Sequence, residues 1–208
     1  MIKIVAVTQR LVRDEKTLEI REALDINWAR LFQSIDLLPV SLPIGCDFKK
    51  YFKNMKISGI VLTGGNDLSS LTKDNLSVMR DKREKELIEF AIKQNLPLFG
   101  ICRGMQIIAE YFGANIIKVR GHVCSNHKIL LNKKSKYKNI LTRIKKVNSF
   151  HNYAVGDIRR GLLISAWSEE GVIEAIEHFQ YKIFGQMWHP EREKPFSQVD
   201  LEFIKKYF

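Results

Sequence analysis

Phe99-Gly100-Ile101-Cys102-Arg103-Gly104-Met105-Gln106 occupies the middle of the chain and has the form of a strand that turns directly into a helix. An apolar run from Leu96 to Ile101 leads into it, and the apolar spacing from Arg103 to Phe112 is typical of a helix. A buried strand followed at once by a helix is the basic unit of an α/β protein. The pattern G-x-C-x-G at the junction corresponds to a nucleophile elbow with cysteine in place of serine.

The cysteine of this turn has the surroundings that a nucleophile needs. Gly100 and Gly104 have no side chains, which permits the close backbone contacts of so tight a turn. Cys102 would stand at the carboxyl edge of a sheet, where the start of a helix favours its thiolate form. The amide of Arg103 could point to the same place and stabilise an oxyanion. A buried structural cysteine beside a helix start is the alternative interpretation.

Apolar runs and amphipathic segments alternate on the N-terminal side of this turn. Continuous apolar runs are expected of buried parallel strands, and apolar residues at helical spacing predict helices. This alternation predicts an α/β fold with a mostly parallel sheet covered on both faces. The apolar runs are Ile2 to Val7, Leu38 to Leu42, Ile57 to Leu62 and Leu96 to Ile101, and the helical segments are Leu24 to Ile35, Asp81 to Gln94 and Arg103 to Phe112.

The C-terminal half changes character. Residues Gly121 to Lys146 are polar and basic, with a short helical stretch near Tyr137 to Leu141. Three short apolar runs follow between turn-like residues, and they predict antiparallel strands added to the sheet. With no linker or repeat in view, residues 1–208 are expected to form a single domain. The three runs are Leu162 to Trp167, Val172 to Ile176 and Tyr181 to Trp188, and a helix from Val199 to Phe208 closes the chain.

The last of these runs ends in Gly185-Gln186-Met187-Trp188-His189-Pro190-Glu191. In an extended segment, residues two apart face the same way, so His189 and Glu191 can approach one site together. A histidine oriented by a carboxylate is what a thiol nucleophile needs as a base and later as an acid. A lone histidine here would more often be structural, but its occurrence together with the cysteine elbow favours catalysis.

Two further segments carry weaker signals. Thr63-Gly64-Gly65-Asn66 follows a predicted strand, and its glycines would let backbone amides approach a ligand, although an ordinary turn has the same composition. Val147-Asn148-Ser149-Phe150-His151-Asn152 places polar groups and a histidine after a short apolar stretch, which says little by itself.

The formal net charge is +11, and its densest region is Lys128 to Lys146. Such charge suits nucleic acid, an acidic membrane surface or an anionic substrate. No zinc-finger spacing or RNA-binding motif accompanies it, so a solvated basic face is favoured over nucleic-acid binding. An anionic small-molecule substrate remains an open alternative.

The cysteine count and the hydropathy further restrict the class of protein to which this chain can belong. Three cysteines, Cys46, Cys102 and Cys124, make an odd number with no C-x-x-C pair, which argues against a disulfide framework or a structural zinc site. No apolar run approaches the roughly 20 residues that cross a bilayer, and the first residues lack the features of a signal peptide. We therefore expect a cytoplasmic protein without membrane association.

The four polar segments, in this order and spacing, resemble the class I glutamine amidotransferase family over nearly the whole chain. The resemblance implies a flavodoxin-like three-layer α/β sandwich with no metal and no organic cofactor. It also implies that Cys102 attacks the γ-carbonyl of a glutamyl group while His189 moves protons and Glu191 orients it.

The same resemblance assigns the groups around the substrate. The amides of Gly65 and Arg103 would form the oxyanion hole. Gln106 would help to hold the glutamyl group, as would the main chain near Ser149 and Phe150.

The elbow variant points to one branch of the family. Biosynthetic members usually carry Leu after the cysteine and Gly-His before the glutamine, whereas this chain has Arg103-Gly104-Met105-Gln106. Together with Asn148-Ser149-x-His151, it resembles the stand-alone γ-glutamyl hydrolases, such as those of γ-glutamyl-γ-aminobutyrate. Asn148 and His151 therefore join the candidate substrate-binding residues. The substrate would be a small γ-glutamyl amide.

A narrower resemblance lies near the N-terminus. Thr8-Gln9-Arg10 and the segment from Glu19 to Trp28 are similar to a subgroup linked to capsule synthesis, the γ-glutamyl-CDP-amidate hydrolases, which release glutamate and cytidine diphosphoramidate. A pyrophosphate would suit the positive charge. Arg10, Arg21 and Arg103 are then candidate phosphate contacts, with surface salt bridges an equal alternative for Arg10 and Arg21.

Two other functions remain open on the sequence. A glutaminase subunit could pass ammonia to a synthetase on another chain, and a basic protein with an inactive amidotransferase fold could bind nucleic acid. A free-standing hydrolase could act as a monomer or as a homodimer.

Overall fold

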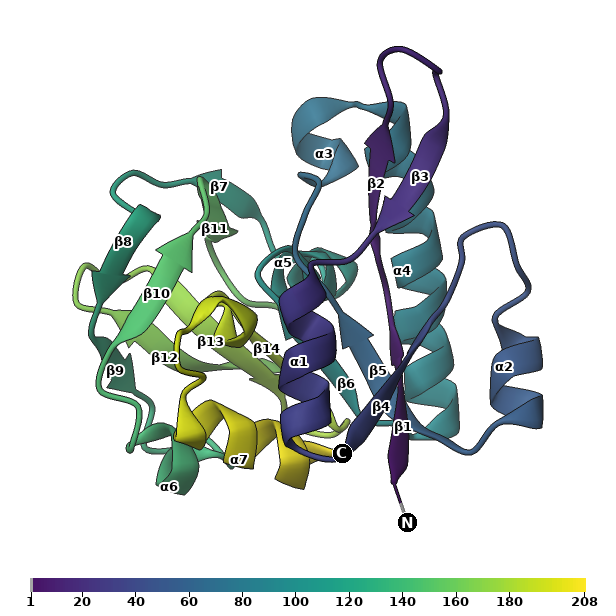
Figure 1. The fold of residues 1–208 in the computed structure, drawn as a ribbon. Helices are drawn as coiled ribbons and strands as arrows, with labels where there is room; N and C mark the ends of the chain where they lie inside the picture. Colours follow the sequence, from purple (N-terminus) through teal and green to yellow (C-terminus); the bar gives the residue numbers. More distant parts are fainter. Residues whose placement is uncertain (1) are drawn as a thin grey trace.

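The computed structural model describes residues 2–208, and its centre is a ten-stranded sheet (Figure 1). The strand order is β4-β1-β5-β6-β14-β13-β11-β7, and β12 and β9 continue from β13. The first five of these strands run parallel. They are β4 Leu37–Ser41, β1 Lys3–Val7, β5 Ile57–Leu62, β6 Leu98–Ile101 and β14 Ile183–Gln186.

Antiparallel strands extend the sheet on the β14 side, as the sequence predicts for β12 and β13, whereas β7, β9 and β11 were not predicted. They are β13 Ile173–His178, β11 Tyr153–Val155, β7 Ile116–Lys118, β12 Leu162–Ser168 and β9 Ile129–Leu131. The prediction that the run from Tyr181 to Trp188 is antiparallel is wrong in one respect. Its strand β14 pairs in parallel with β6 and is antiparallel only to β13.

Helices cover both faces of the sheet, which gives three layers. In the view of Figure 1, α1 and α7 lie in front of the sheet, and α4 and α5 lie behind it. The helices are α1 Ile26–Ser34, α2 Lys49–Asn54, α3 Ser69–Thr72, α4 Asn75–Gln94, α5 Arg103–Tyr111, α6 Lys138–Leu141 and α7 Gln198–Tyr207, with a 3-10 turn η1 at Pro190–Arg192. No helix within residues 2–208 is both long and apolar enough to cross a bilayer.

Two small antiparallel pairs were not predicted. They are β2 Arg10–Arg13 with β3 Ile20–Ala23, and β8 Val123–His127 with β10 Val147–Phe150. All four strands are short and lack a regular apolar alternation; β2, β3 and β8 are mostly exposed, whereas β10 is buried but half polar. Helix α4 also begins six residues earlier than predicted, because the Asp74 side chain caps it by accepting a hydrogen bond from the Ser77 amide at 3.2 Å.

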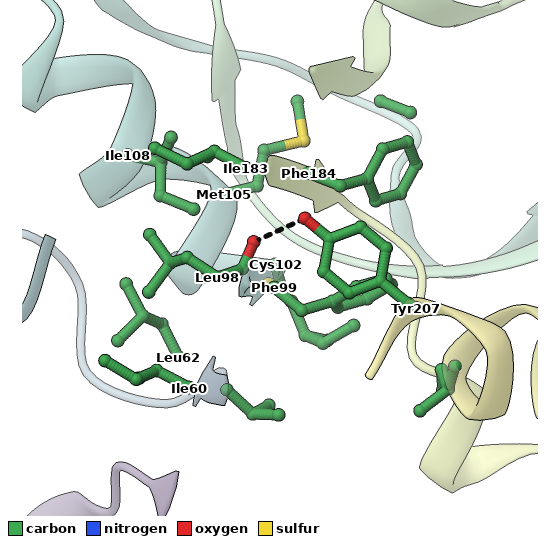
Figure 2. Packing of buried hydrophobic residues seen from close by; sticks show 14 of the residues in the cluster. Ile60, Leu62, Leu98, Phe99, Cys102, Met105, Ile108, Ile183, Phe184 and Tyr207 are labelled. Atoms are coloured by element: carbon green, nitrogen blue, oxygen red, sulfur yellow. Dashed lines mark hydrogen bonds between the residues drawn. The ribbon is translucent and has the colours of Figure 1, made fainter. Parts of the chain in front are cut away.

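The core packs tightly beneath the cysteine turn (Figure 2). The ring of Phe99 lies 5.3 Å from that of Phe184 and 5.1 Å from that of Tyr207. The Tyr207 hydroxyl donates to the carbonyl of Leu98 at 3.0 Å, so α7 is hydrogen-bonded to the strand that leads to Cys102. A rigid base of this kind can position a catalytic group reproducibly.

The four neighbouring parallel strands β1, β5, β6 and β14 end at one edge of the sheet. Directly beyond their carboxyl ends lie Thr8, the loop Thr63-Gly64-Gly65, Cys102 and, after Met187 and Trp188, His189. Ligands of open α/β sheets bind at this edge. The fold therefore brings together segments that are far apart in the sequence.

Candidate active site

Cys102 has a strained backbone. Its φ of 52° and ψ of −105° lie in a region that residues with a side chain rarely adopt. A Cβ at Gly100 would come within 2.6 Å of the Gly104 carbonyl, and a Cβ at Gly104 would overlap the carbonyl oxygen of Leu62. Both glycines are therefore required by close approach, and the predicted tight turn between β6 and α5 is confirmed.

His189 lies opposite this turn and is oriented by a carboxylate. Its Nδ1 atom is 2.6 Å from Oε1 of Glu191, and both side chains are buried. A Cβ at Gly64 would lie 3.0 Å from Cε1 of His189 and 3.8 Å from Cβ of Cys102, so the two side chains flank the same glycine. Among residues 2–208, nothing hydrogen-bonds to Nε2 of His189, which leaves this nitrogen available for proton transfer.

The charge state of His189 follows from opposing effects. Burial by itself lowers the pKa of the imidazole, but the negative charges of Cys102 and Glu191 outweigh it and raise the pKa of His189 to about 9. At neutral pH, the ring is therefore an imidazolium between a carboxylate and the sulfur of Cys102. Such a pair is the arrangement of an activated cysteine nucleophile.

Asn148 holds the backbone of His189 in place. Its Oδ1 accepts from the His189 amide at 2.8 Å, and its Nδ2 donates to the His189 carbonyl at 2.8 Å and to Glu193 Oε1 at 2.6 Å. Asn148 is therefore bonded to the histidine itself. The sequence placed it among the substrate contacts, and its role in positioning the base was missed, because nothing in the sequence shows which segment lies beside His189.

A buried ionic network lies behind the nucleophile. The Arg103 guanidinium pairs with Asp81 and Glu84, and Arg80 donates to Glu84 Oε1 at 3.0 Å. Arg80 also donates to the carbonyls of Thr63 at 2.7 Å and of Gly64 at 3.0 Å. The network therefore connects the start of α5 to the glycine loop.

Burial and neighbouring charges shift the pKa values of two groups in this network. Burial lowers the pKa of Arg80 to about 10, which still leaves it charged at pH 7. Burial works to raise the pKa of Glu84, but Arg103 and Arg80 more than offset it and lower that pKa. The predicted phosphate contact by the side chain of Arg103 is wrong, because this side chain is 1% exposed and engaged by two carboxylates.

The backbone amides of Gly65 and Arg103 face no hydrogen-bond acceptor from the described part of the chain. Gly65 has a φ of +125°, and a Cβ there would come within 2.6 Å of Cβ of Arg10. The loop can therefore adopt this shape only with glycine. An oxyanion hole built from these two amides remains a prediction, and the geometry leaves both donors available for it.

A small pocket opens beside the histidine, between η1, α1 and the start of β2. Of the arginines predicted to contact phosphate, only Arg10 lines it. Arg21 lies instead on the exposed hairpin, paired with Asp14 at 3.1 Å and Glu19 at 2.6 Å. The pocket is lined by Arg10, Ala23, Leu24, Asp25, Trp28, Thr63, Gly64, Gly65, His189, Glu191 and Arg192.

Arg192 is a second pocket arginine that sequence reasoning missed. Its guanidinium carbon lies 4.4 Å from the centre of the Phe150 ring, and this ring meets that of His189 edge-on at 5.8 Å. The signal was available, because Arg192 directly follows the H-P-E motif. The stacking supports a cationic group at the mouth of the pocket.

Three other predicted substrate contacts have side chains bonded within the protein. Gln106 Nε2 donates to the carbonyl of Tyr153 at 2.8 Å, and Nδ1 of His151 is 3.1 Å from the same oxygen. The Ser149 hydroxyl donates to the carbonyl of His122 at 2.7 Å. All three side chains are buried, so the structure does not bring them into the pocket lining.

Comparison with known proteins agrees with this geometry. Residues 1–191 match the Peptidase C26 family. A γ-glutamyl-CDP-amidate hydrolase from Campylobacter jejuni subsp. jejuni is 35% identical over 208 aligned residues, which cover 98% of this chain and 96% of that protein.

Solved structures share the fold at lower sequence identity. A putative GMP synthase protein from Thermoplasma acidophilum has a TM-score of 0.74 at 18% identity and covers 100% of this chain and 92% of its own. A glutamine amidotransferase from Thermotoga maritima has a TM-score of 0.71 at 19% identity and covers 99% and 84%. The predicted flavodoxin-like sandwich of the class I glutamine amidotransferases is confirmed, and the chain belongs to the Peptidase C26 family within that class.

Proposed function

We propose that this protein is a cysteine hydrolase that cleaves γ-glutamyl amide bonds, with Cys102, His189 and Glu191 as its catalytic triad. One observation carries the proposal. A buried imidazolium, bonded to a carboxylate at 2.6 Å, lies across one glycine from a cysteine on a strained strand-to-helix turn. This is the constellation of a nucleophile, a base and an orienting acid.

In the first half-reaction, the Cys102 thiolate attacks the γ-carbonyl carbon and forms a tetrahedral oxyanion. The amides of Gly65 and Arg103 would donate to this oxygen, where charge develops in the transition state. The C–N bond then breaks, and the proton on Nε2 of His189 goes to the leaving nitrogen. The product is a γ-glutamyl thioester on Cys102 and a free amine or amidate.

The second half-reaction regenerates the enzyme. Neutral His189 takes a proton from water, and the resulting hydroxide attacks the thioester carbon. The C–S bond breaks, glutamate leaves, and the thiolate–imidazolium pair is restored. Glu191 keeps the ring in one orientation throughout and stabilises its charged form.

The leaving group that fits best is an anionic one, and γ-glutamyl-CDP-amidate is the substrate we infer. Arg10 and Arg192 line the pocket beside His189, and guanidinium groups bind phosphate oxygens bidentately. The similarity to the C. jejuni hydrolase extends over nearly the whole chain and supports the same inference. The main chain at Ser149 and Phe150 would hold the glutamyl end. A role in capsule modification follows from this substrate.

Glutamate release from three amides tests this proposal: γ-glutamyl-CDP-amidate, γ-glutamyl-γ-aminobutyrate and glutamine. We expect a marked preference for the nucleotide amide. Cys102→Ala should abolish turnover and keep the fold, whereas Cys124→Ala, at an exposed cysteine, should retain activity. Glutamate release by a folded Cys102→Ala protein would refute the triad. Preference for the aminobutyrate amide, or for glutamine with a synthetase present, would keep the triad and replace the substrate.

A further inference from the structure

A second cluster of ionisable groups lies away from Cys102, and its centre is Glu174. This residue is on β13, fully buried, and neither of its carboxylate oxygens accepts a hydrogen bond from the described chain. Buried carboxylates are almost always hydrogen-bonded, because water has been removed and the charge needs a replacement. Both oxygens of Glu174 thus remain available to a ligand.

Three imidazoles surround one oxygen of this carboxylate. Oε1 of Glu174 is 3.1 Å from Nε2 of His127, 3.3 Å from Nδ1 of His122 and 3.7 Å from Nε2 of His151. The contacts do not have hydrogen-bond geometry, since Nε2 of His127 and Nε2 of His151 also lack a partner within residues 2–208. The ring of His122 lies 4.8 Å from that of His127 and 4.9 Å from that of His151.

The distances from Oε1 of Glu174 to His127 and His122 are close to those between atoms that share a metal ion. In a tetrahedral zinc site with bonds of 2.0–2.1 Å, ligand atoms are about 3.3 Å apart. The ligand atoms of His122, His127 and Glu174 all lie within 4.8 Å of one another. We propose that these three residues bind a divalent transition-metal ion such as Zn²⁺. Two imidazoles and one carboxylate form a donor set that suits zinc and leaves a fourth position for water.

The surroundings agree with binding from solution. His127 is 16% exposed and thus gives an ion a path to the cluster, and the exposed Glu170 carboxylate lies 3.6 Å from Nε2 of His122. His151 faces the same carboxylate and would orient it as an outer partner.

A metal ion at this site would bear on the separate two-stranded sheet β8–β10. His122 directly precedes β8, and its carbonyl accepts the Ser149 hydroxyl of β10. The preceding residue on β10, Asn148, holds His189. A metal would therefore stabilise the side of the active site that carries the base. The family resemblance implies no metal, so this site adds a feature beyond the catalytic reaction.

Cobalt binding to the metal-stripped protein tests the inference without any measurement of turnover. We expect one Co²⁺ per chain, with visible bands of nitrogen and oxygen ligands and without the intense near-ultraviolet bands of a cobalt–thiolate bond. Zn²⁺ should displace it and raise the melting temperature. His127→Gln and Glu174→Gln should each weaken binding about tenfold or more, as loss of a ligand or its partner does.

Two matched variants separate this site from the cysteines. Cys124→Ser, at an exposed residue on β8, and Cys102→Ala should bind Co²⁺ as the unmodified chain does. His127→Gln is the safer ligand variant for folding, because its side chain reaches the surface. Absence of Co²⁺ and Zn²⁺ binding by folded protein would overturn the inference, as would binding that His127→Gln leaves unchanged or that Cys124→Ser abolishes.

Discussion

The two sides of the candidate active site are stabilised in different ways. The nucleophile side rests on buried charges, where Arg103 and Arg80 connect two carboxylates to the backbone of the glycine loop. The base side rests on two hydrogen bonds between the Asn148 side chain and the His189 backbone, and on the pairing of the His189 ring with the Glu191 carboxylate. Just beyond it lies Glu174, a buried carboxylate with no hydrogen bonds of its own within the described residues.

This difference indicates that the backbone on the nucleophile side has to be held rigidly. The strained backbone of Cys102 persists only if its surroundings determine it strongly, and a network of charge-assisted hydrogen bonds does this. In the network, the only side-chain atom without a partner in the described residues is Nε of Arg103. The base side has the pair of His189 and Glu191 instead, and the charge of His189 responds to the charge of the nucleophile.

The largest expected effect comes from breaking the nucleophile side. Arg103→Met should lower the free energy of unfolding by about 3–5 kcal/mol, because it leaves the buried carboxylates of Asp81 and Glu84 without their shared cation. Denaturant unfolding measures this loss. The partly exposed pair of Lys85 and Glu110 provides the control, and Lys85→Met should cost about 1 kcal/mol or less. Equal losses in the two variants would contradict the special role of the buried network.

The sequence predicts the fold well where burial determines the pattern. The apolar runs of β1, β5 and β6 are continuous because both faces of these strands are covered, and the elbow glycines mark the turn at Cys102. The pairs β2–β3 and β8–β10 were missed since their strands are short, with β2, β3 and β8 largely exposed and β10 half polar. Their pairing depends on tertiary contacts rather than on local periodicity.

The candidate catalytic residues can be predicted from the sequence, but the residues that hold them in place are harder to predict. Cys102, His189 and Glu191 lie on recognisable motifs, and the structure brings them to one edge of the sheet. The partners of Arg103 come from another helix, and Glu174 gathers histidines from separate segments. Such long-range partners leave no mark in the local sequence, which is why Arg103 was assigned to phosphate. The single-domain organisation stays a prediction.

A smaller effect is expected from weakening the base side. Asn148→Ala removes both hydrogen bonds to the His189 backbone, so kcat should fall about 10–100-fold through misplacement of the base. Steady-state kinetics should show the loss mainly in kcat, with KM little changed. The exposed Asn152 on the same segment is the matched control, and Asn152→Ala should keep full activity. A change confined to KM would instead support the predicted substrate contact by Asn148.

The smallest expected effect is a pH dependence, which arises because the charge of the nucleophile affects the charge of the base. The His189 imidazolium is stabilised by the negative charges of Cys102 and Glu191 against the opposing effect of burial, which gives a pKa of about 9. A raised pKa means that protonation favours the fold. This stabilisation is complete below the ordinary value of 6.5 and is lost as pH rises through about 9. Above that value, kcat/KM should decline about tenfold per pH unit as the proton for the leaving nitrogen disappears.

Removal of the Cys102 thiolate tests directly whether the nucleophile and the base influence each other's charge. In Cys102→Ala, one of the two charges that raise the pKa of His189 is gone, so the ring should titrate at lower pH. Nuclear magnetic resonance of labelled histidine rings, with His189→Gln to assign the signal, measures this shift directly. The fold should survive, because the charged network on the nucleophile side does not depend on the sulfur. An unchanged pKa in Cys102→Ala would mean that Glu191 alone sets the charge of the base, and the two sides would then be electrostatically independent.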